Sequence, residues 1–480
     1  IFFMKILYVA SEAVPFASSG GLGDVIGSLP AAVSRRLGSD SDVRAVIPLY
    51  HSVREKFGDQ IVLEKEFYVP LSWRRQYCGI WSIVKDNVKF YFVDNEYYFK
   101  RNLLYGSFDD GERFAFFCRA VLEMMGAVDF YPDILHANDW QSALSVIYLK
   151  RKYAGIREYS EIKTLYTIHN IEYQGIYGFD ILNDIFDLYE WDRGIVEYNG
   201  DVNLSKGAIA VADKVSSVSE KYAEEILTPY YSHGLFHILE SCRYKLCGIV
   251  NGIDTEYYNP STDSVIPYHY SSANISGKSK DKAALQRKCG FEVSHDVPVI
   301  AMVTRLVAHK GLDLVCRIID EMLNTDDIQF VLLGTGDSDF ENFFREAAER
   351  HPGRLCAMIE FNKDLSRLIY AGADMFLMPS KSEPCGLAQM ISSRYGTVPI
   401  VRETGGLYDT VKAYNKYDGS GNGFSFANYN AHEMLGVIRE AVAVFSDRRK
   451  WNKLVKQVMN VDFSWNVSAE KYAALYRSML

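Results

Sequence analysis

The sequence predicts an α/β protein with two doubly wound parallel sheets. Short apolar runs alternate with amphipathic helical stretches, which is the pattern of strands joined by covering helices. Six such runs lie in the first half, at 5–10, 43–48, 88–93, 133–137, 164–169 and 214–219, and five in the second, at 297–303, 328–334, 355–360, 374–380 and 398–403. Because 480 residues exceed one ordinary core, each series is expected to form its own domain.

The join between the two series is expected near residues 255–280, which are rich in Ser, Tyr, Asn and Pro and are typical of a loop. The charge run at 278–288 comes next, and we interpret it as the solvent-exposed face of a helix.

Composition excludes several classes of protein. A net charge of −9 argues against a general nucleic-acid binder, which needs cations to neutralise phosphates. The eight cysteines are scattered without a C-x-x-C pair, so a disulfide framework and a structural zinc site are not expected. No apolar run has the length of a membrane span, and the start lacks the features of a signal peptide. We therefore expect a cytoplasmic protein with no membrane partner.

Polar residues come directly after the predicted strands of the first half, where ligands of open parallel sheets bind. After 5–10 comes the loop 18–24, "SSGGLGD", whose glycine pair before a helix suits an anion. Asp139 and His169 come after two further strands. A lone histidine in this position is, however, more typical of a hydrogen-bonded core residue.

The second half shows the same arrangement. Arg305 and Lys310 flank a strand-to-helix turn, a spacing that suits a diphosphate, although a surface role is about as plausible from the local sequence. Glu383 precedes a helix start, where it could cap the helix or face a ligand. A second glycine pair in "RETGGLYDTV" (402–411) predicts a comparable loop at this sheet edge. No spacing of His, Cys, Asp or Glu matches a metal site.

Longer motifs lie in a fixed order along the chain, from "KILYVASEAVPFASSGGLGDV" through "HANDWQ", "TIHNIEYQG", "VNGIDTEYYNP", "TRLVAHKGLDL" and "PSKSEPCGLAQM" to "DFSWNVSAEKYAALY". Together they resemble the bacterial glycogen synthase and plant starch synthase family. The resemblance implies the GT-B architecture, in which two Rossmann-like domains face each other across a cleft. The expected domains are 4–247 on the acceptor side and 248–458 on the nucleotide-sugar side, with a C-terminal helix in 459–480 returning to the first.

The resemblance also implies the reaction, which is retaining transfer of glucose from ADP-glucose to the non-reducing-end 4-OH of an α-1,4-glucan such as glycogen. No metal or other cofactor is expected, and the sequence leaves the oligomeric state open. A front-face mechanism, in which the leaving phosphate helps to deprotonate the acceptor, fits the residues. Double displacement with Glu383 as nucleophile is the alternative.

Roles carry over by position from the family motifs. The expected catalytic residues are Arg305 and Lys310, which bind the diphosphate, Glu383, which is the essential acid, and His169, which faces the transferred glucose. The expected substrate-binding residues are Ser18, Gly20, Gly21, Asp24, Tyr97, Asp139, Trp140, Asn251, Cys385, Gly386 and Leu387.

Three positions depart from the family pattern. Ser18 replaces a usual Lys, Gln141 replaces a usual His, and Lys381-Ser382 replaces Arg-Phe. The competing hypotheses are another nucleotide-sugar enzyme on this architecture, of the sucrose-synthase or epimerase type, and a catalytically weak glucan-binding relative. The missing Lys is the only support for the latter, and no cofactor-lysine context favours a phosphorylase.

Overall fold

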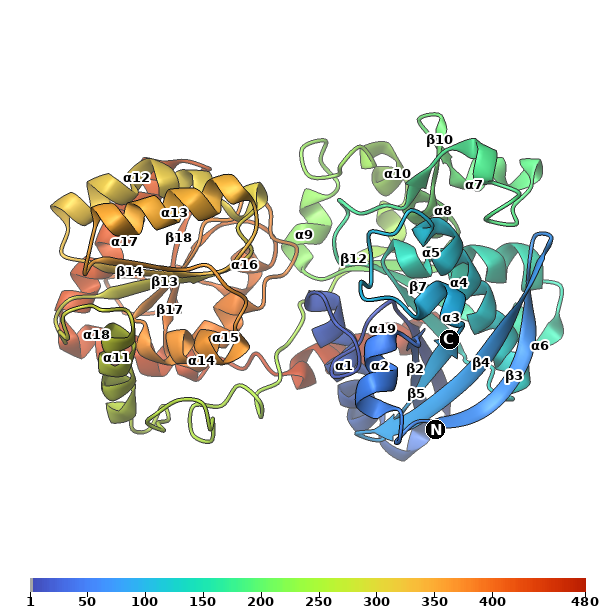
Figure 1. The fold of residues 1–480 in the computed structure, drawn as a ribbon, viewed down its shortest axis with the longest axis horizontal. Coiled ribbons are helices and arrows are strands. Elements are labelled where there is room, and N and C mark those ends of the chain that lie inside the picture. The colour runs from blue at the N-terminus through green and yellow to red at the C-terminus, as the bar shows by residue number, and fades with distance from the viewer. Residues whose placement is uncertain (1–2) are drawn as a thin grey trace. The chain divides into compact units, whose positions relative to one another are not determined.

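The computed structural model describes residues 3–480, which form two compact units. Unit 1 runs to Asn251 and also includes Trp465–Leu480, and unit 2 is Gly252–Ser464 (Figure 1). Every predicted apolar run forms a strand of one of the two main sheets. Within residues 3–480, no helix is long and apolar enough to cross a membrane.

The main sheet of unit 1 has nine strands in the order β12–β11–β7–β6–β1–β2–β5–β4–β3. They span Met4–Val9 (β1), Ser41–Pro48 (β2), Val62–Leu71 (β3), Arg74–Lys85 (β4), Val88–Asp94 (β5), Ile134–Asn138 (β6), Lys163–Ile168 (β7), Lys214–Ser217 (β11) and Leu246–Gly248 (β12). The strands from β12 to β5 run parallel, so their carboxyl ends share one edge. A small antiparallel sheet holds Ile176–Tyr177 (β8), Glu197–Tyr198 (β9) and Asp201–Asn203 (β10).

The expectation of purely parallel sheets is wrong at one edge of unit 1. β3 and β4 form an antiparallel hairpin, and β4 also pairs antiparallel with β5. The charged residues Glu64, Lys65 and Glu66 interrupt the apolar residues of β3, and most of the strand is exposed. An edge strand of this kind lacks the continuous apolar run of a buried parallel strand, so the search for such runs missed it.

The helices of unit 1 cover its main sheet. They span Gly21–Leu37 (α1), His51–Phe57 (α2), Glu96–Phe99 (α3), Asp110–Ala127 (α4), Trp140–Tyr148 (α5), Arg157–Ser160 (α6), Arg193–Val196 (α7), Leu204–Val211 (α8), Glu220–Glu225 (α9), Phe236–Ser241 (α10) and Trp465–Met479 (α19). The last helix, α19, packs against α1 and is tied to the sheet by Tyr476. The Tyr476 hydroxyl lies 2.7 Å from the Tyr8 hydroxyl of β1 and 2.7 Å from His136 Nδ1 of β6.

Unit 2 has a six-stranded parallel sheet in the order β15–β14–β13–β16–β17–β18. Its strands span Val299–Val303 (β13), Gln329–Leu333 (β14), Leu355–Met358 (β15), Met375–Met378 (β16), Val398–Arg402 (β17) and Phe424–Phe426 (β18). Its helices span Ser276–Lys288 (α11), Leu312–Thr325 (α12), Ser338–Arg350 (α13), Lys363–Gly372 (α14), Ala388–Arg394 (α15), Gly405–Thr410 (α16), Ala431–Ser446 (α17) and Arg448–Met459 (α18). Figure 1 shows α12 and α13 on one face of this sheet and α14 and α15 on the other.

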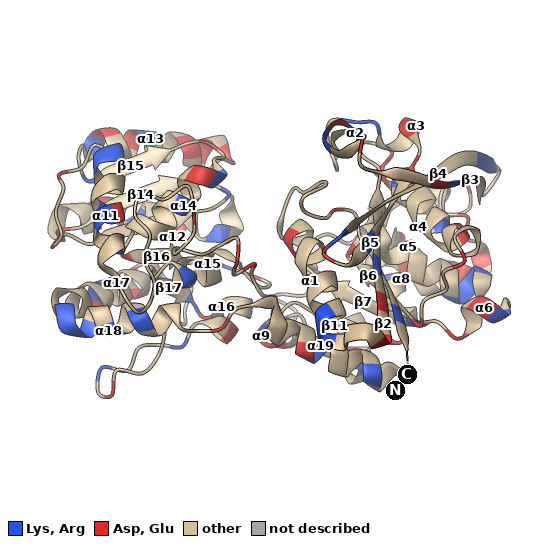
Figure 2. Cartoon of the chain, turned by 90° about the horizontal axis from the view of Figure 1, so that it is seen from below, with Lys and Arg blue, Asp and Glu red and all other residues tan. Residues whose placement is uncertain are grey.

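Charges of both signs mix on the outer surface, for example along α13 (Figure 2). The interpretation of 278–288 as a solvent-exposed face holds for Lys280, Arg287 and Lys288. It is wrong for Lys278, Asp281 and Lys282, which α11 buries. Lys278 and Lys282 reach residues directly before β17 and β16, whereas Asp281 accepts the N–H of Tyr268 at 3.0 Å. Backbone groups there need polar partners, and a charged helix face supplies them.

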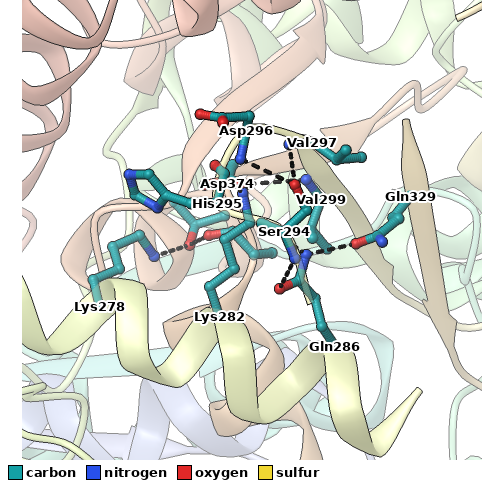
Figure 3. A network of polar contacts seen from close by, with 12 residues as sticks. Lys278, Lys282, Gln286, Ser294, His295, Asp296, Val297, Val299, Gln329 and Asp374 are labelled. Atoms are coloured by element: carbon teal, nitrogen blue, oxygen red, sulfur yellow. Dashed lines mark hydrogen bonds and ion pairs between the residues drawn. The ribbon is translucent and has the colours of Figure 1, made fainter. Parts of the chain in front are cut away.

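Figure 3 shows the resulting polar network. Lys282 Nζ forms a 2.8 Å ion pair with Asp374 Oδ2, and that oxygen accepts the Val299 N–H at 2.8 Å. Gln286 Nε2 donates to Gln329 Oε1 at 2.7 Å and to the Ser294 carbonyl at 2.9 Å. The network therefore joins α11 to the beginnings of β13 and β14 and to Asp374, directly before β16.

Among the residues that the structure describes, no carboxylate bonds directly to the amine of Lys278. Its Nζ donates to the Ala371 carbonyl at 2.9 Å and to Thr397 Oγ1 at 2.8 Å. Burial lowers the pKa of Lys278 to about 7, although the charges of Asp374 and Asp281 oppose the shift. Above that pH the folded protein holds a neutral amine where the unfolded chain holds a charged one.

This shift predicts a pH dependence of stability. Between pH 7 and 9.5 the unfolded state binds the extra proton, so the free energy of unfolding should rise with pH, by up to about 1.4 kcal/mol per pH unit. Lys278→Met should abolish this rise, whereas Lys280→Met, at an exposed position of the same helix, should retain it. Calorimetric melting temperatures across this range give the readout. A rise that persists in Lys278→Met would contradict the assignment.

Candidate active site

Three neighbouring strands of unit 1 bring predicted residues together. β7, β6 and β1 are adjacent, and their carboxyl ends lead into His169, Asp139 and the glycine loop. The His169 backbone N–H donates to Asp139 Oδ1 at 2.8 Å. The sequence prediction that these residues share one sheet edge is therefore confirmed.

The His169 ring is held as a neutral imidazole. Its Nε2 lies 2.8 Å from Asn138 Oδ1. The Asn138 amide nitrogen donates to the carbonyls of Val9 and His136, at 3.2 and 3.1 Å, so its oxygen is the acceptor and His169 Nε2 carries the proton. Burial lowers the pKa of His169 to about 3. The other nitrogen, Nδ1, is then an acceptor suited to a hydroxyl group.

Asp139 has an unusual backbone conformation for a non-glycine residue, with φ of 58° and ψ of 177°. Burial raises the pKa of its carboxyl to about 7, against the opposing effect of the His169 and Asn170 N–H groups, and the Glu12 charge adds to the rise. Strained conformations of this kind persist where the surroundings fix them, and they gather at functional sites.

The glycine loop after β1 leads into α1, with Gly20 as its N-cap. Ser18, Gly20, Gly21 and Asp24 are all exposed at this helix start. The Ser18 hydroxyl donates to the Gly20 carbonyl at 3.3 Å. The predicted loop residues are thus accessible to a ligand, and their binding role stays a prediction.

Glu12 is a buried acid behind this loop that the sequence analysis missed. Its Oε2 accepts both the Ser19 N–H and the Ser19 hydroxyl, the latter at 3.0 Å. Burial raises the pKa of Glu12, the bonds from Ser19 oppose the shift, and the nearby Asp24 charge adds to it. One backbone donor of the loop is therefore already engaged by the chain itself. The sequence did offer one indication of this residue, because Glu12 is an acid that follows the end of β1 by three positions.

The remaining predicted residues of unit 1 lie in separate surroundings. Trp140 packs edge-on against Phe114, with ring centroids 5.4 Å apart, whereas Tyr97 on α3 is 68% exposed. Asn251 and Gln141 are buried, and their side-chain oxygens have no hydrogen-bond partner within residues 3–480. Buried orphan oxygens of this kind are unfavourable unless a ligand or water pairs with them.

In unit 2, Lys310 and Glu383 form a tight ion pair. Lys310 Nζ lies 3.0 Å from Glu383 Oε1 and 2.7 Å from Oε2, and the Ser380 hydroxyl donates to Oε2 at 2.9 Å. Glu383 is only 6% exposed. The two residues lie 73 positions apart in the sequence, at the carboxyl ends of the adjacent strands β13 and β16.

Gly311 lets the Lys310 turn approach the Glu383 segment. It has φ of +76°, and a Cβ added there would lie 2.0 Å from the Pro379 carbonyl oxygen. The Lys381 N–H donates to the His309 carbonyl at 2.9 Å across the same contact. Only glycine fits both the backbone conformation and the close approach.

The second glycine pair braces the Glu383 segment from the other side. A Cβ on Gly405 would lie 1.8 Å from the Glu383 carbonyl oxygen, and one on Gly406 would lie 2.0 Å from that of Cys385. The Gly406 N–H donates to the Glu383 carbonyl at 3.1 Å. The pair begins α16 after β17, as the first pair begins α1 after β1, which agrees with the expected similarity of the two loops.

Several donors at this edge of unit 2 are unused. Arg305 is exposed, and no side-chain partner of its guanidinium lies within residues 3–480. The backbone N–H groups of Gly386 and Leu387 likewise meet no acceptor in that range, while Cys385 beside them is buried. The same described residues contain no group of three or more His, Cys, Asp and Glu that could hold a metal ion.

Comparisons with known proteins match both units. The model of the starch synthase catalytic domain matches residues 5–241, and that of glycosyl transferases group 1 matches 290–458. A glycogen synthase of Bacillus cereus is 46% identical over 479 residues, covering 99% of this chain and 100% of the relative. One from Alkaliphilus metalliredigens is 46% identical over 478 residues, with the same coverage. The chain belongs to the glycogen and starch synthase family.

Two solved structures match the GT-B fold, and the one from Arabidopsis also supports the family. The catalytic domain of starch synthase IV from Arabidopsis thaliana, solved with ADP and acarbose bound, matches with a TM-score of 0.90, 31% identity and 99% coverage of both chains. A sucrose-phosphate synthase from Thermosynechococcus elongatus, at 16% identity and a TM-score of 0.61 over 99% of this chain and 98% of its own, shares the fold. The chain is a glycosyltransferase of the glycogen and starch synthase type, which disfavours the sucrose-synthase and epimerase alternatives.

The role of Gly311 in this synthase is testable against a matched glycine. Gly353 has a nearly identical φ of +77° but open space around its Cβ position. Gly353→Ala should cost about 1–2 kcal/mol from the left-handed backbone alone. Gly311→Ala should cost a further 1–3 kcal/mol or so from overpacking, and it should lower kcat by displacing Lys310. Urea unfolding and glucose transfer measure both effects, and equal behaviour of the two variants would refute the close-approach argument.

Proposed function

We propose that the enzyme transfers glucose from ADP-glucose to the non-reducing-end 4-OH of an α-1,4-glucan, with retention of configuration. The observation that carries the proposal is the group of donors at one sheet edge of unit 2, namely Lys310, Arg305 and the N–H groups of Gly386 and Leu387. Fixed cations and backbone amides are suited to the charge that develops on a departing nucleoside diphosphate. The ADP bound to the Arabidopsis relative supports an adenine nucleotide.

The residues of unit 1 are suited to the sugar rather than to the phosphates. The neutral His169 offers an acceptor nitrogen, and Asp139 offers a carboxylate, to hydroxyl groups of the transferred glucose. The aromatic rings of Trp140 and Tyr97 are proposed to lie along the acceptor. Because the loop at Ser18 lacks a lysine, the full positive charges come from unit 2.

The eight free cysteines support the expected reducing cytoplasm.

The contacts of Glu383 favour a front-face mechanism over double displacement. Both of its carboxylate oxygens accept hydrogen bonds from Lys310, and one also accepts from Ser380. A carboxylate whose oxygens accept these hydrogen bonds is a poor nucleophile. It can, however, hold the lysine in position to bind the diphosphate. The leaving phosphate oxygen would then take the proton of the attacking 4-OH on the same face of the sugar.

The donor is tested directly with purified protein and glycogen. ADP-[14C]glucose should label the polymer and release ADP in equal amounts, whereas UDP-glucose should support at least about tenfold lower kcat/KM, a difference of 1.4 kcal/mol in transition-state binding. NMR of the elongated chain should show only α-1,4 linkages. Equal use of both donors would refute the ADP preference, and a β-linked product would refute retention.

Glu383→Gln tests the role of the ion pair. Loss of the negative charge should free Lys310 from its fixed position and lower kcat by about a hundredfold or more, the scale of a lost electrostatic donor. Ser380→Ala is the matched control, because it removes one bond to Oε2 and leaves the ion pair, so kcat should fall less than about tenfold. A melting temperature for each variant separates catalysis from folding. If azide restored turnover to Glu383→Ala and yielded β-glucosyl azide, double displacement would be supported instead.

A further inference from the structure

Two of the most exposed large side chains of unit 1 are tryptophans that no part of the proposed reaction uses. Trp73, at the turn between β3 and β4, is 75% exposed, and Trp191, just before α7, is 72% exposed. Indole rings are large and apolar, and such exposure is unfavourable unless something covers the ring. In Figure 1 the β3–β4 turn and α7 lie on the same side of unit 1.

Trp191 is held rigidly rather than left free. Its ring stacks on Tyr189 with centroids 4.6 Å apart and an interplanar angle of 15°. Lys152 Nζ lies 5.1 Å from the centre of the Tyr189 ring, which gives the stack a cationic support. The turn beneath the stack is closed by Asp192, whose carboxylate accepts the Tyr189 N–H at 3.1 Å and Arg151 Nε at 2.7 Å.

Trp73 is fixed by contacts to the same part of the chain. Its indole N–H donates to Asp184 Oδ1 at 2.5 Å, and the Arg74 guanidinium lies 4.5 Å from its ring. Arg74 is itself held by Glu112 at 2.9 Å and by Asp184 Oδ2 at 3.3 Å. Both tryptophans are thereby anchored to the segment 184–192. We call Trp73, Tyr189 and Trp191 the aromatic shelf.

We propose that the aromatic shelf is a glucan-binding surface that holds the polymer apart from the residues assigned to catalysis. Pyranose rings present C–H faces that stack on aromatic rings, and their hydroxyl edges need polar partners beside those rings. Rigid rings give up little conformational freedom when a sugar stacks on them. The exposed charges of Asp184, Glu190 and Arg193 flank the rings and suit the hydroxyl groups.

A glucan fits this surface better than a second protein does. Stable protein interfaces bury about 800 Å² on each partner around a continuous apolar centre. The shelf instead offers only three rings, two of them stacked on each other, with charged side chains beside them. The inference also rests on the proposed function, in which a glucan is the acceptor. A second binding site for a long polymer raises the local concentration of its chains at the site of transfer.

The test compares glycogen with a short acceptor in the purified enzyme. Trp73→Ala and Trp191→Ala should each weaken glycogen binding by about 3- to 10-fold, and the double variant by more, as expected for lost aromatic stacking. Binding is measured by affinity gel electrophoresis in glycogen, without any donor. The KM for glycogen should rise, while kcat and KM for maltotriose should stay at wild-type values. Trp191→Phe should keep most of the affinity, and Tyr417→Ala, at an 88% exposed tyrosine of unit 2, should change nothing.

Three outcomes would overturn the inference. Unchanged glycogen binding in the double variant would remove the shelf as a glucan site. If the variants lost equal activity with glycogen and with maltotriose, the rings would either line the acceptor channel or stabilise the fold. Melting temperatures would distinguish these two roles. A change in sedimentation with unchanged glycogen binding would make the shelf a contact between copies of the chain. Because the binding assay uses no nucleotide sugar, it stands even if the proposed donor fails.

Discussion

The ion pair between Lys310 and Glu383 depends on backbone segments that approach more closely than side chains normally allow. Glu383 is almost fully buried, and an unpaired carboxylate in that position would be costly by several kcal/mol. Lys310 reaches it because Gly311 places its turn against Pro379, and Gly405 supports the carbonyl of Glu383 from the other side. The glycines in these two motifs therefore act through packing. They set the position of a charge that a flexible loop could not hold.

The two units carry opposite kinds of chemistry at their strand ends. Unit 2 presents cations and backbone donors, whereas unit 1 presents a neutral imidazole and carboxylates. The neutrality of His169 results from burial, and its tautomer is set by Asn138, whose amide is itself oriented by two backbone carbonyls. A charged imidazole would attract phosphate, whereas a neutral one selects for hydroxyl groups. Burial and hydrogen bonds in the core thus determine the charge that each unit presents at its strand ends.

Strand periodicity and motif order made much of the fold predictable from the sequence. All the apolar runs became strands, and the residues at their carboxyl ends lie at common sheet edges, because parallel strands must end there. The β3–β4 hairpin, whose exposed residues break the apolar run, and the buried face of α11 were not predictable in this way. A charged helix face is normally solvated. This one is buried because polar groups at the beginning of the sheet need hydrogen-bond or ion-pair partners, as the ion pair of Lys282 with Asp374 shows.

The glycine loop shows why a single substitution is hard to interpret from sequence alone. Where the family usually has a lysine, Ser18 turns back toward α1, and a Cβ on Gly23 would lie only 2.4 Å from its hydroxyl oxygen. Behind it, Glu12 is buried and takes its hydrogen bonds from Ser19. A lysine at position 18 would therefore have a buried carboxylate nearby, and part of its charge would be neutralised by Glu12. In this chain Ser19 donates to Glu12 instead, so the loop satisfies its buried carboxylate without a lysine.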